Sequence, residues 1–284
     1  MTQRVLVPYD SSEQADYALA HAVGAFTDAK IVLFHVIEPF ADHTSAAGYD
    51  GARYKQRLET TEQMLESVAD EYDADIETVA QYGRPVHWIV RYIEQNSIDH
   101  VVIGSHGRDG AKRLLLGSVA ETVARRSPVP VTVVRKPPDG AELPETILVP
   151  FDASACARKA LVYALEQFED SEVTALYAAY PPVDGTREMD TVFNVLEDWD
   201  EVRADHVSSV LDVATEIADE HNRTIETLNV DGEPANAIIE QADDTGVNQI
   251  IMGSTGRDGL SRLLLGSVAE VIIRRAPVTV TVVK

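Results

Sequence analysis

One stretch of the chain occurs twice, and this repeat limits the possible folds more than any other feature. Residues 101–134 (VVIGSHGRDGAKRLLLGSVAETVARRSPVPVTVV) return 149 positions later as residues 250–283 (IIMGSTGRDGLSRLLLGSVAEVIIRRAPVTVTVV). Aligned without a gap, 23 of the 34 positions are identical, which indicates an internal duplication. A chain of 284 residues can form two domains that each bury a core. We predict domains at residues 1–136 and 145–284, joined by a linker at residues 137–144 that is rich in proline and glycine.

Within each copy, an apolar run leads into glycines that precede an amphipathic helix. The shared pattern is Gly-x2-Gly-x9-Gly-Ser, which comprises Gly104, Gly107, Gly117 and Ser118 in the first copy and Gly253, Gly256, Gly266 and Ser267 in the second. Backbone N–H groups converge at a helix N-terminus, and glycines leave room for an anion beside them. The pattern therefore predicts one anion site per half, and we also expect the two serines to cap their helices. Plain turns are the alternative interpretation, which the identical spacing in both copies disfavours.

Apolar strands alternate with amphipathic helices along both halves. Strand patterns occur at residues 4–8, 31–37, 76–82, 101–104 and 129–134, and again at residues 146–150, 173–178, 225–230, 249–253 and 278–283. A long acidic helix is expected at about residues 187–221. The alternation predicts a parallel sheet covered by helices on both faces, in which ligands bind beyond the carboxyl ends of the strands where strand order reverses. If the first and fourth strands of each half are neighbours at this point, Asp10 and Gly104 face one crevice, and Asp152 and Gly253 another.

The charge of the chain limits its partners. It has 47 acidic and 24 basic residues, a formal net charge of −23, so we do not expect it to bind nucleic acid. Only six of the basic residues are lysine, and an acidic, arginine-favouring surface is typical of halophilic proteins kept soluble in concentrated salt. An ordinary acidic cytosolic protein is the alternative. The start lacks an apolar targeting core and no apolar run approaches ~20 residues, so we expect a cytoplasmic protein without a membrane partner.

The glycine segments are locally basic within this acidic chain. Arg108 and Arg257 occupy the same place in the two copies, as expected if each segment receives an anion. Pairing of these arginines with Asp109, Asp258 or helix ends is the alternative. His106 is the only histidine in these segments, and its counterpart is Thr255, so we interpret it as a ligand contact rather than a general base shared by the two sites.

Several other chemistries are not supported by the sequence. There is no Gly-x-x-x-x-Gly-Lys-Ser/Thr, and no Gly-x-Gly-x-x-Gly follows the first strand. No metal-ligand spacing of His, Cys and Glu occurs, and Cys156, the single cysteine, is expected to pack as a small apolar residue.

The glycine pattern, together with VPYDSS at the start, LFHVIEP in the second strand and PVPVTVV at the end of the first half, resembles the universal stress protein family. The resemblance covers both halves, so the chain is similar to a tandem member of the ATP-binding branch. It implies two Rossmann-like α/β domains of the adenine nucleotide alpha hydrolase-like type. Each would have a five-stranded parallel sheet of order 3-2-1-4-5 flanked by helices. It also implies pairing of the two domains through residues 129–134 and 278–283, and a homodimer of the whole chain is left open.

The resemblance further implies which residues hold an adenine nucleotide. Asp10 and the backbone of Val36 would face the adenine and ribose, and the glycine segments the ribose and phosphates. The expected residues are Pro8, Asp10, Val36, Gly104, His106, Gly107, Arg108, Gly117, Ser118 and Val119 in the first half and Pro150, Asp152, Ala178, Gly253, Thr255, Gly256, Arg257, Gly266, Ser267 and Val268 in the second. The ligand would be ATP, ADP or AMP, with Mg²⁺ carried on the phosphates because no protein cage for the ion is visible.

These expectations lead to a functional hypothesis with two alternatives. The leading one is a cytoplasmic ATP-binding universal stress protein that acts as a nucleotide-dependent regulatory or sensing module in the stress response. A slow ATPase or phosphoryl-transfer enzyme would need a metal and a group that positions the nucleophile beside the γ-phosphate. Asp10 and Asp152 are the only acids at strand tips in both copies. We expect them to contact the nucleoside, so no catalytic residue is assigned. An assembly scaffold in which nucleotide is incidental is the third possibility.

Overall fold

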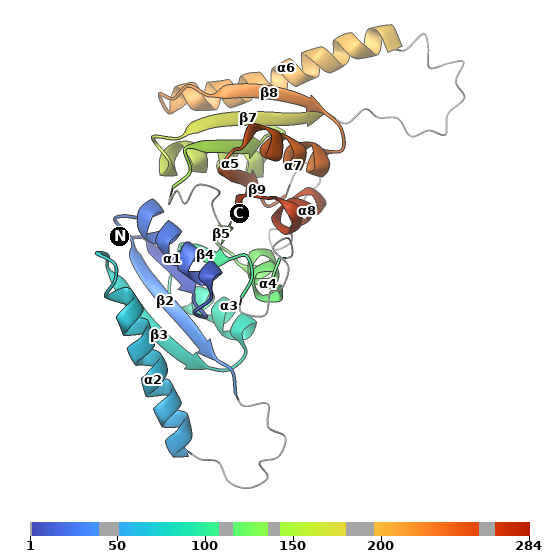
Figure 1. The fold of residues 1–284 in the computed structure, drawn as a ribbon. Helices are drawn as coiled ribbons and strands as arrows, with labels where there is room; N and C mark the ends of the chain where they lie inside the picture. Colours follow the sequence, from blue (N-terminus) through green and yellow to red (C-terminus); the bar gives the residue numbers. More distant parts are fainter. Residues whose placement is uncertain (1, 40–50, 108–115, 136–142, 180–195, 256–264) are drawn as a thin grey trace, which may run out of the picture. The chain divides into compact units, whose positions relative to one another are not determined.

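The computed structural model divides the chain into two compact units, Met1–Leu143 (unit 1) and Pro144–Lys284 (unit 2). It describes residues 2–39, 51–107, 116–135, 143–179, 196–255 and 265–284 (Figure 1). The expected start of the long acidic helix, at residues 187–195, lies outside the described residues.

Unit 1 is a parallel α/β unit. In chain order its elements are β1 (Arg4–Pro8), α1 (Glu13–Ala25), β2 (Lys30–Ile37), α2 (Gly51–Ala69), β3 (Ile76–Tyr82), α3 (Pro85–Gln95), β4 (His100–Gly104), α4 (Ser118–Arg126) and β5 (Val131–Val134). The strands lie in the order β3-β2-β1-β4-β5, and every pair among them is parallel. The predicted order 3-2-1-4-5 is confirmed. Because strand order reverses between β1 and β4, the loops that follow these two strands open into one crevice.

Unit 2 repeats this arrangement. Its elements are β6 (Thr146–Pro150), α5 (Ala155–Gln167), β7 (Glu172–Ala179), α6 (Leu196–Glu220), β8 (Glu226–Asp231), α7 (Pro234–Thr245), β9 (Gln249–Gly253), α8 (Ser267–Arg275) and β10 (Thr279–Val283). The strand order is β8-β7-β6-β9-β10, again with parallel pairs, so β6 and β9 flank the reversal.

Local sequence signals explain where the helices after the first strands begin. Ser12 caps α1 by accepting a hydrogen bond from the Ala15 N–H, and Ser154 caps α5 in the same way. Prolines at the first turns of α3 and α7 remove an N–H that would have no partner within the helix. The central strands are buried on both faces, as their continuous apolar runs predicted. Among the described helices, none is long and apolar enough to cross a bilayer.

Each unit has a buried hydrogen-bonded pair of polar side chains between its fourth and fifth strands, but the residues differ. In unit 1 the Nε2 of His100 lies 2.9 Å from the Thr132 hydroxyl, and in unit 2 the Gln249 amide donates to the Thr281 hydroxyl at 2.8 Å. Burial, with a smaller contribution from the neighbouring His21, lowers the pKa of His100 from 6.5 to about 3. The imidazole is therefore neutral in the folded unit and titrates in the unfolded chain.

This difference predicts a pH-dependent loss of stability that the His100→Gln variant lacks. Below about pH 6.5 the unfolded chain binds a proton that folded unit 1 does not, so the free energy of unfolding falls as the pH drops towards 3. The slope of this contribution is about 1.4 kcal/mol per pH unit. Urea unfolding of wild type and His100→Gln between pH 7 and 4 measures it, and parallel pH profiles of the two proteins would contradict it.

Candidate functional site

Unit 1 has a cavity of about 600 Å³ at the carboxyl ends of β1, β2 and β4. This volume lies within the usual range for small-molecule sites. The predicted residues that line it are Pro8, Asp10, Val36, Gly104, His106, Gly107, Gly117, Ser118 and Val119. Arg108, also predicted, lies outside the described residues. The loops after β1 and β4 therefore meet at one crevice, as their positions in the sequence predicted.

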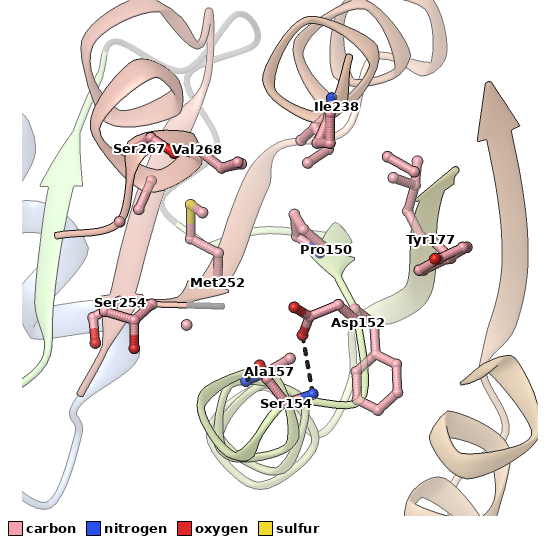
Figure 2. Close-up of a pocket in the computed structure, with 18 residues that line it drawn as sticks. Pro150, Asp152, Ser154, Ala157, Tyr177, Ile238, Met252, Ser254, Ser267 and Val268 are labelled. Carbon is pink, nitrogen blue, oxygen red and sulfur yellow. Dashed lines mark hydrogen bonds between the residues drawn. The ribbon is translucent and has the colours of Figure 1, made fainter. Parts of the chain in front are cut away.

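Unit 2 has a matching cavity of about 500 Å³. Its lining includes Pro150, Asp152, Ala178, Gly253, Thr255, Gly266, Ser267 and Val268 from the predicted set. Gly256 and Arg257 lie outside the described residues. Figure 2 shows Asp152, in the loop after β6, Met252, on β9, and Val268, on α8, around one open space.

A tight turn presents the aspartate to each cavity. The Asp10 Oδ1 accepts hydrogen bonds from the Ser12 N–H, at 3.1 Å, and from the Ser12 hydroxyl. In unit 2 the Asp152 Oδ1 accepts from the Ser154 N–H at 3.0 Å (Figure 2). The residue between them has a left-handed backbone in both units, with φ of 60° at Ser11 and at Ala153. Such strained positions are held by surrounding structure and are common at ligand sites, so the turn pre-positions the carboxylate.

The first glycine of each pattern serves packing rather than ligand approach. A Cβ on Gly104 would lie 2.7 Å from the backbone carbonyl oxygen of Gln14 in α1, and one on Gly253 would lie 2.7 Å from the backbone of Cys156 in α5. These glycines therefore let a helix pack directly on the strand. Gly107 has a different task, because a Cβ there would collide with the Oδ2 of Asp10. The absence of its side chain leaves room for the aspartate in the cavity.

The third glycine, not the serine after it, is the N-cap of the last helix. Gly117 precedes α4 and Gly266 precedes α8, and neither helix has a side-chain cap. Our prediction that Ser118 and Ser267 cap these helices is wrong, because each is the first helical residue. The glycine N–H groups donate to the carbonyls of Ser105 and Ser254, both at 2.7 Å. The predicted anion sites would therefore use the amides of the first helical turn, which have no partner within the helix.

Comparisons with known proteins identify the fold family. The sequence profile described as the universal stress protein family matches residues 1–135 and 144–284. The chain belongs to the universal stress protein family. A universal stress protein of Methanocaldococcus jannaschii is 33% identical over 141 residues, covering 48% of this chain and 83% of that protein. One from Mycobacterium tuberculosis is 26% identical over 228 residues, covering 77% of this chain and 72% of that protein.

The crystal structure of a universal stress protein from Archaeoglobus fulgidus superposes with a TM-score of 0.68. The two sequences are 25% identical, and the superposition covers 99% of this chain and 98% of the Archaeoglobus protein. Two universal stress protein domains therefore follow one another here, and each contains one of the two cavities.

The two universal stress protein domains differ around the glycine loops. In unit 1 the Ser105 hydroxyl lies 3.1 Å from the Nδ1 of His106. In unit 2 the Thr255 hydroxyl lies 3.4 Å from the Cys156 sulfur, so the single cysteine contacts a loop residue as well as packing beside the strand. Among the described residues there is no group of three or more His, Cys, Asp or Glu that could hold a metal ion.

The sequence prediction missed the walls of both cavities. Apolar side chains supply much of the lining, namely Phe34, Ile89, Ile103 and Ala120 in unit 1 and Leu176, Ile238, Met252 and Ala269 in unit 2. Tyr9 also lines the first cavity, where burial and a hydrogen bond to Asp16 raise its pKa, so the hydroxyl stays protonated and donates to Asp16 at 2.6 Å. Phe34 and Leu176 could have been predicted as wall residues from strand register, because they pair with Pro8 and Pro150 at the ends of the first strands.

Proposed function

We propose that this chain is a cytoplasmic ATP-binding regulatory or sensing module of the stress response, with one nucleotide site in each unit. The observation that supports it best is the repeated constellation of an aspartate turn, an apolar wall and an uncapped helix N-terminus around one cavity. Adenine and ribose need apolar surface and a hydrogen-bond acceptor, whereas phosphates need N–H groups. Both cavities offer these features together.

The proposed placement of the nucleotide follows the chemistry of the two ends of the cavity. The carboxylates of Asp10 and Asp152 can accept hydrogen bonds from ribose hydroxyls. The phosphate chain would lie against the first turns of α4 and α8, where backbone N–H groups and the helix dipole favour negative charge. ATP, ADP and AMP share these requirements, and a Mg²⁺ ion would be held by the phosphates rather than by protein ligands.

Equilibrium dialysis of the purified chain with labelled ATP, at the high salt that its acidic composition suits, tests the proposal. We expect saturable binding below millimolar ATP, competed by ADP and AMP. Asp10→Asn is expected to weaken binding by unit 1 about tenfold or more, because a neutral amide loses the charge-assisted hydrogen bond to ribose. Absence of binding at millimolar ATP would overturn the proposal.

Two further features belong to the same proposal. Assay of phosphate release from the same samples distinguishes a passive binder from a slow ATPase. We expect no turnover by this chain. Pairing of the two units through their last strands and a homodimer of the chain stay predictions. Light-scattering mass with and without ATP tests the homodimer.

A further inference from the structure

We propose that unit 1 binds adenine nucleotides that carry a phosphate on the ribose in addition to the 5′ phosphate. The inference rests on the proposed function and names the ligand class of one of its two sites. It comes from a second cavity of about 460 Å³ between α2, β2 and the turn after β1. This second cavity shares His35 and Arg57 with the nucleotide cavity, so the two cavities adjoin one another.

The position of the second cavity points to the nucleoside end of the ligand. Its lining includes Ser11, which follows Asp10, and His35, which precedes Val36. The residues expected to hold the 5′ phosphates, Ser118 and Val119, line only the nucleotide cavity. A group of the ligand that enters the second cavity is therefore attached to the nucleoside. The ribose 2′ and 3′ hydroxyls are the points of a nucleoside to which a phosphate is attached.

The charge of the second cavity selects an anion. Arg53 and Arg57 line it together with His35, and the described residues contribute no acidic side chain to it. This is unusual in a chain with 47 acidic residues. The two arginines are four residues apart on α2 and therefore lie on the same face of the helix. A phosphate beside this face could accept hydrogen bonds from both guanidinium groups.

Two of the basic residues, Arg57 and His35, are held in place by contacts with the backbone. The Arg57 Nη1 donates to the Glu38 carbonyl at 3.1 Å, and the Nδ1 of His35 lies 2.7 Å from the Tyr9 carbonyl. The first turn of α2 is fixed on β3 by the Tyr82 hydroxyl, which donates to the Tyr54 carbonyl at 2.7 Å. A guanidinium positioned before the ligand arrives loses less entropy on binding.

The described residues of unit 2 do not repeat this arrangement. Residues 8 and 34 pair in unit 1 as residues 150 and 176 do in unit 2, which places Tyr177 where unit 1 has His35. Its ring packs against His206 of α6 with centroids 5.9 Å apart. The neighbouring Arg203 pairs with Asp231. A cavity between the turn after β6 and α6 is lined by one arginine, Arg158, and by Asp152, so the two charges offset one another there.

Calorimetric titration with AMP, 3′-phosphoadenosine 5′-phosphate and its 2′ isomer tests the inference at one fixed salt concentration. We expect one of the two sites in each chain to bind a bisphosphate at least about tenfold more tightly than AMP. Arg53→Gln and Arg57→Gln are each expected to remove most of this preference. Lys55→Gln is the matched control, because Lys55 lies between them in sequence, pairs with Glu59 and does not line the cavity.

The outcomes separate this inference from the proposed function. AMP binding without a preference for either bisphosphate would overturn the inference alone. A preference that survives both arginine substitutions, or that Lys55→Gln also removes, would overturn it as well. If none of the three nucleotides binds while ATP still binds, the inference alone fails; if ATP does not bind either, the proposed function fails with it.

Discussion

A Ser118→Asp substitution is expected to weaken ATP binding by unit 1 at least about 100-fold without unfolding the unit. Ser118 is exposed and is the first residue of α4, where an acidic side chain interacts favourably with the helix dipole. The same carboxylate would stand where the proposal places the phosphates, and like charges brought together cost several kcal/mol. A 100-fold loss of affinity corresponds to about 2.7 kcal/mol. Titration of ATP into the variant measures the loss.

The isosteric variant Ser118→Asn supplies the control for this prediction. It has the same shape as the aspartate but no charge, so we expect it to keep affinity within a few fold of wild type. Ser267→Asp and Ser267→Asn repeat the comparison in unit 2, where Ser267 is the first residue of α8. If the aspartate and asparagine variants bind ATP equally well, the phosphates do not lie at these helix N-termini.

Gly104→Ala is expected to destabilise unit 1 by about 2–4 kcal/mol, a large effect for a single methyl group. In an open position alanine would instead stabilise the fold slightly, by restricting the unfolded chain. The new Cβ would lie 2.7 Å from the Gln14 carbonyl oxygen, and this contact is with the backbone of α1, which cannot rotate away as the end of a flexible side chain can. The strand and α1 must therefore move apart. Hydrogen exchange of unit 1 peptides, with unit 2 peptides as internal reference, measures the change.

Gly107→Ala is the matched control three residues away. There the Cβ would meet the end of the Asp10 side chain, which can turn aside, so we expect stability to change by less than about 1 kcal/mol. The substitution displaces the Asp10 carboxylate instead, so we expect it to weaken nucleotide binding rather than to destabilise the fold. Equal loss of protection in the two variants would show that the first and second glycines do not have the different tasks that the structure gives them.

The fold could be predicted from the sequence because its signals are local and occur twice. Apolar runs such as residues 146–150 correspond to the observed strands, and Ser12 and Ser154 cap the helices that follow the first strands. The site residues Asp10, Gly104 and Gly117 come together because strand order reverses between β1 and β4, an order that the family resemblance implied.

Other parts of the site depend on contacts between distant residues, which no local pattern reveals. The three glycines looked equivalent in the sequence, but only the structure shows that Gly104 contacts α1 while Gly107 makes room for Asp10. The sequence predicted Ser118 as the N-cap of α4, but the structure has Gly117 there, and the Gly117 N–H donates to the distant Ser105 carbonyl. Arg57 was missed because it comes from a helix that lies in sequence between the two site loops.

The central claim is that the chain has two separate nucleotide-binding sites, and the number of nucleotides bound per chain tests it most directly. Equilibrium dialysis with saturating labelled ATP is expected to give two per chain for wild type, one each for Ser118→Asp and Ser267→Asp, and none for the double variant. A wild-type value of zero, or a value of two that persists in the double variant, would contradict the account.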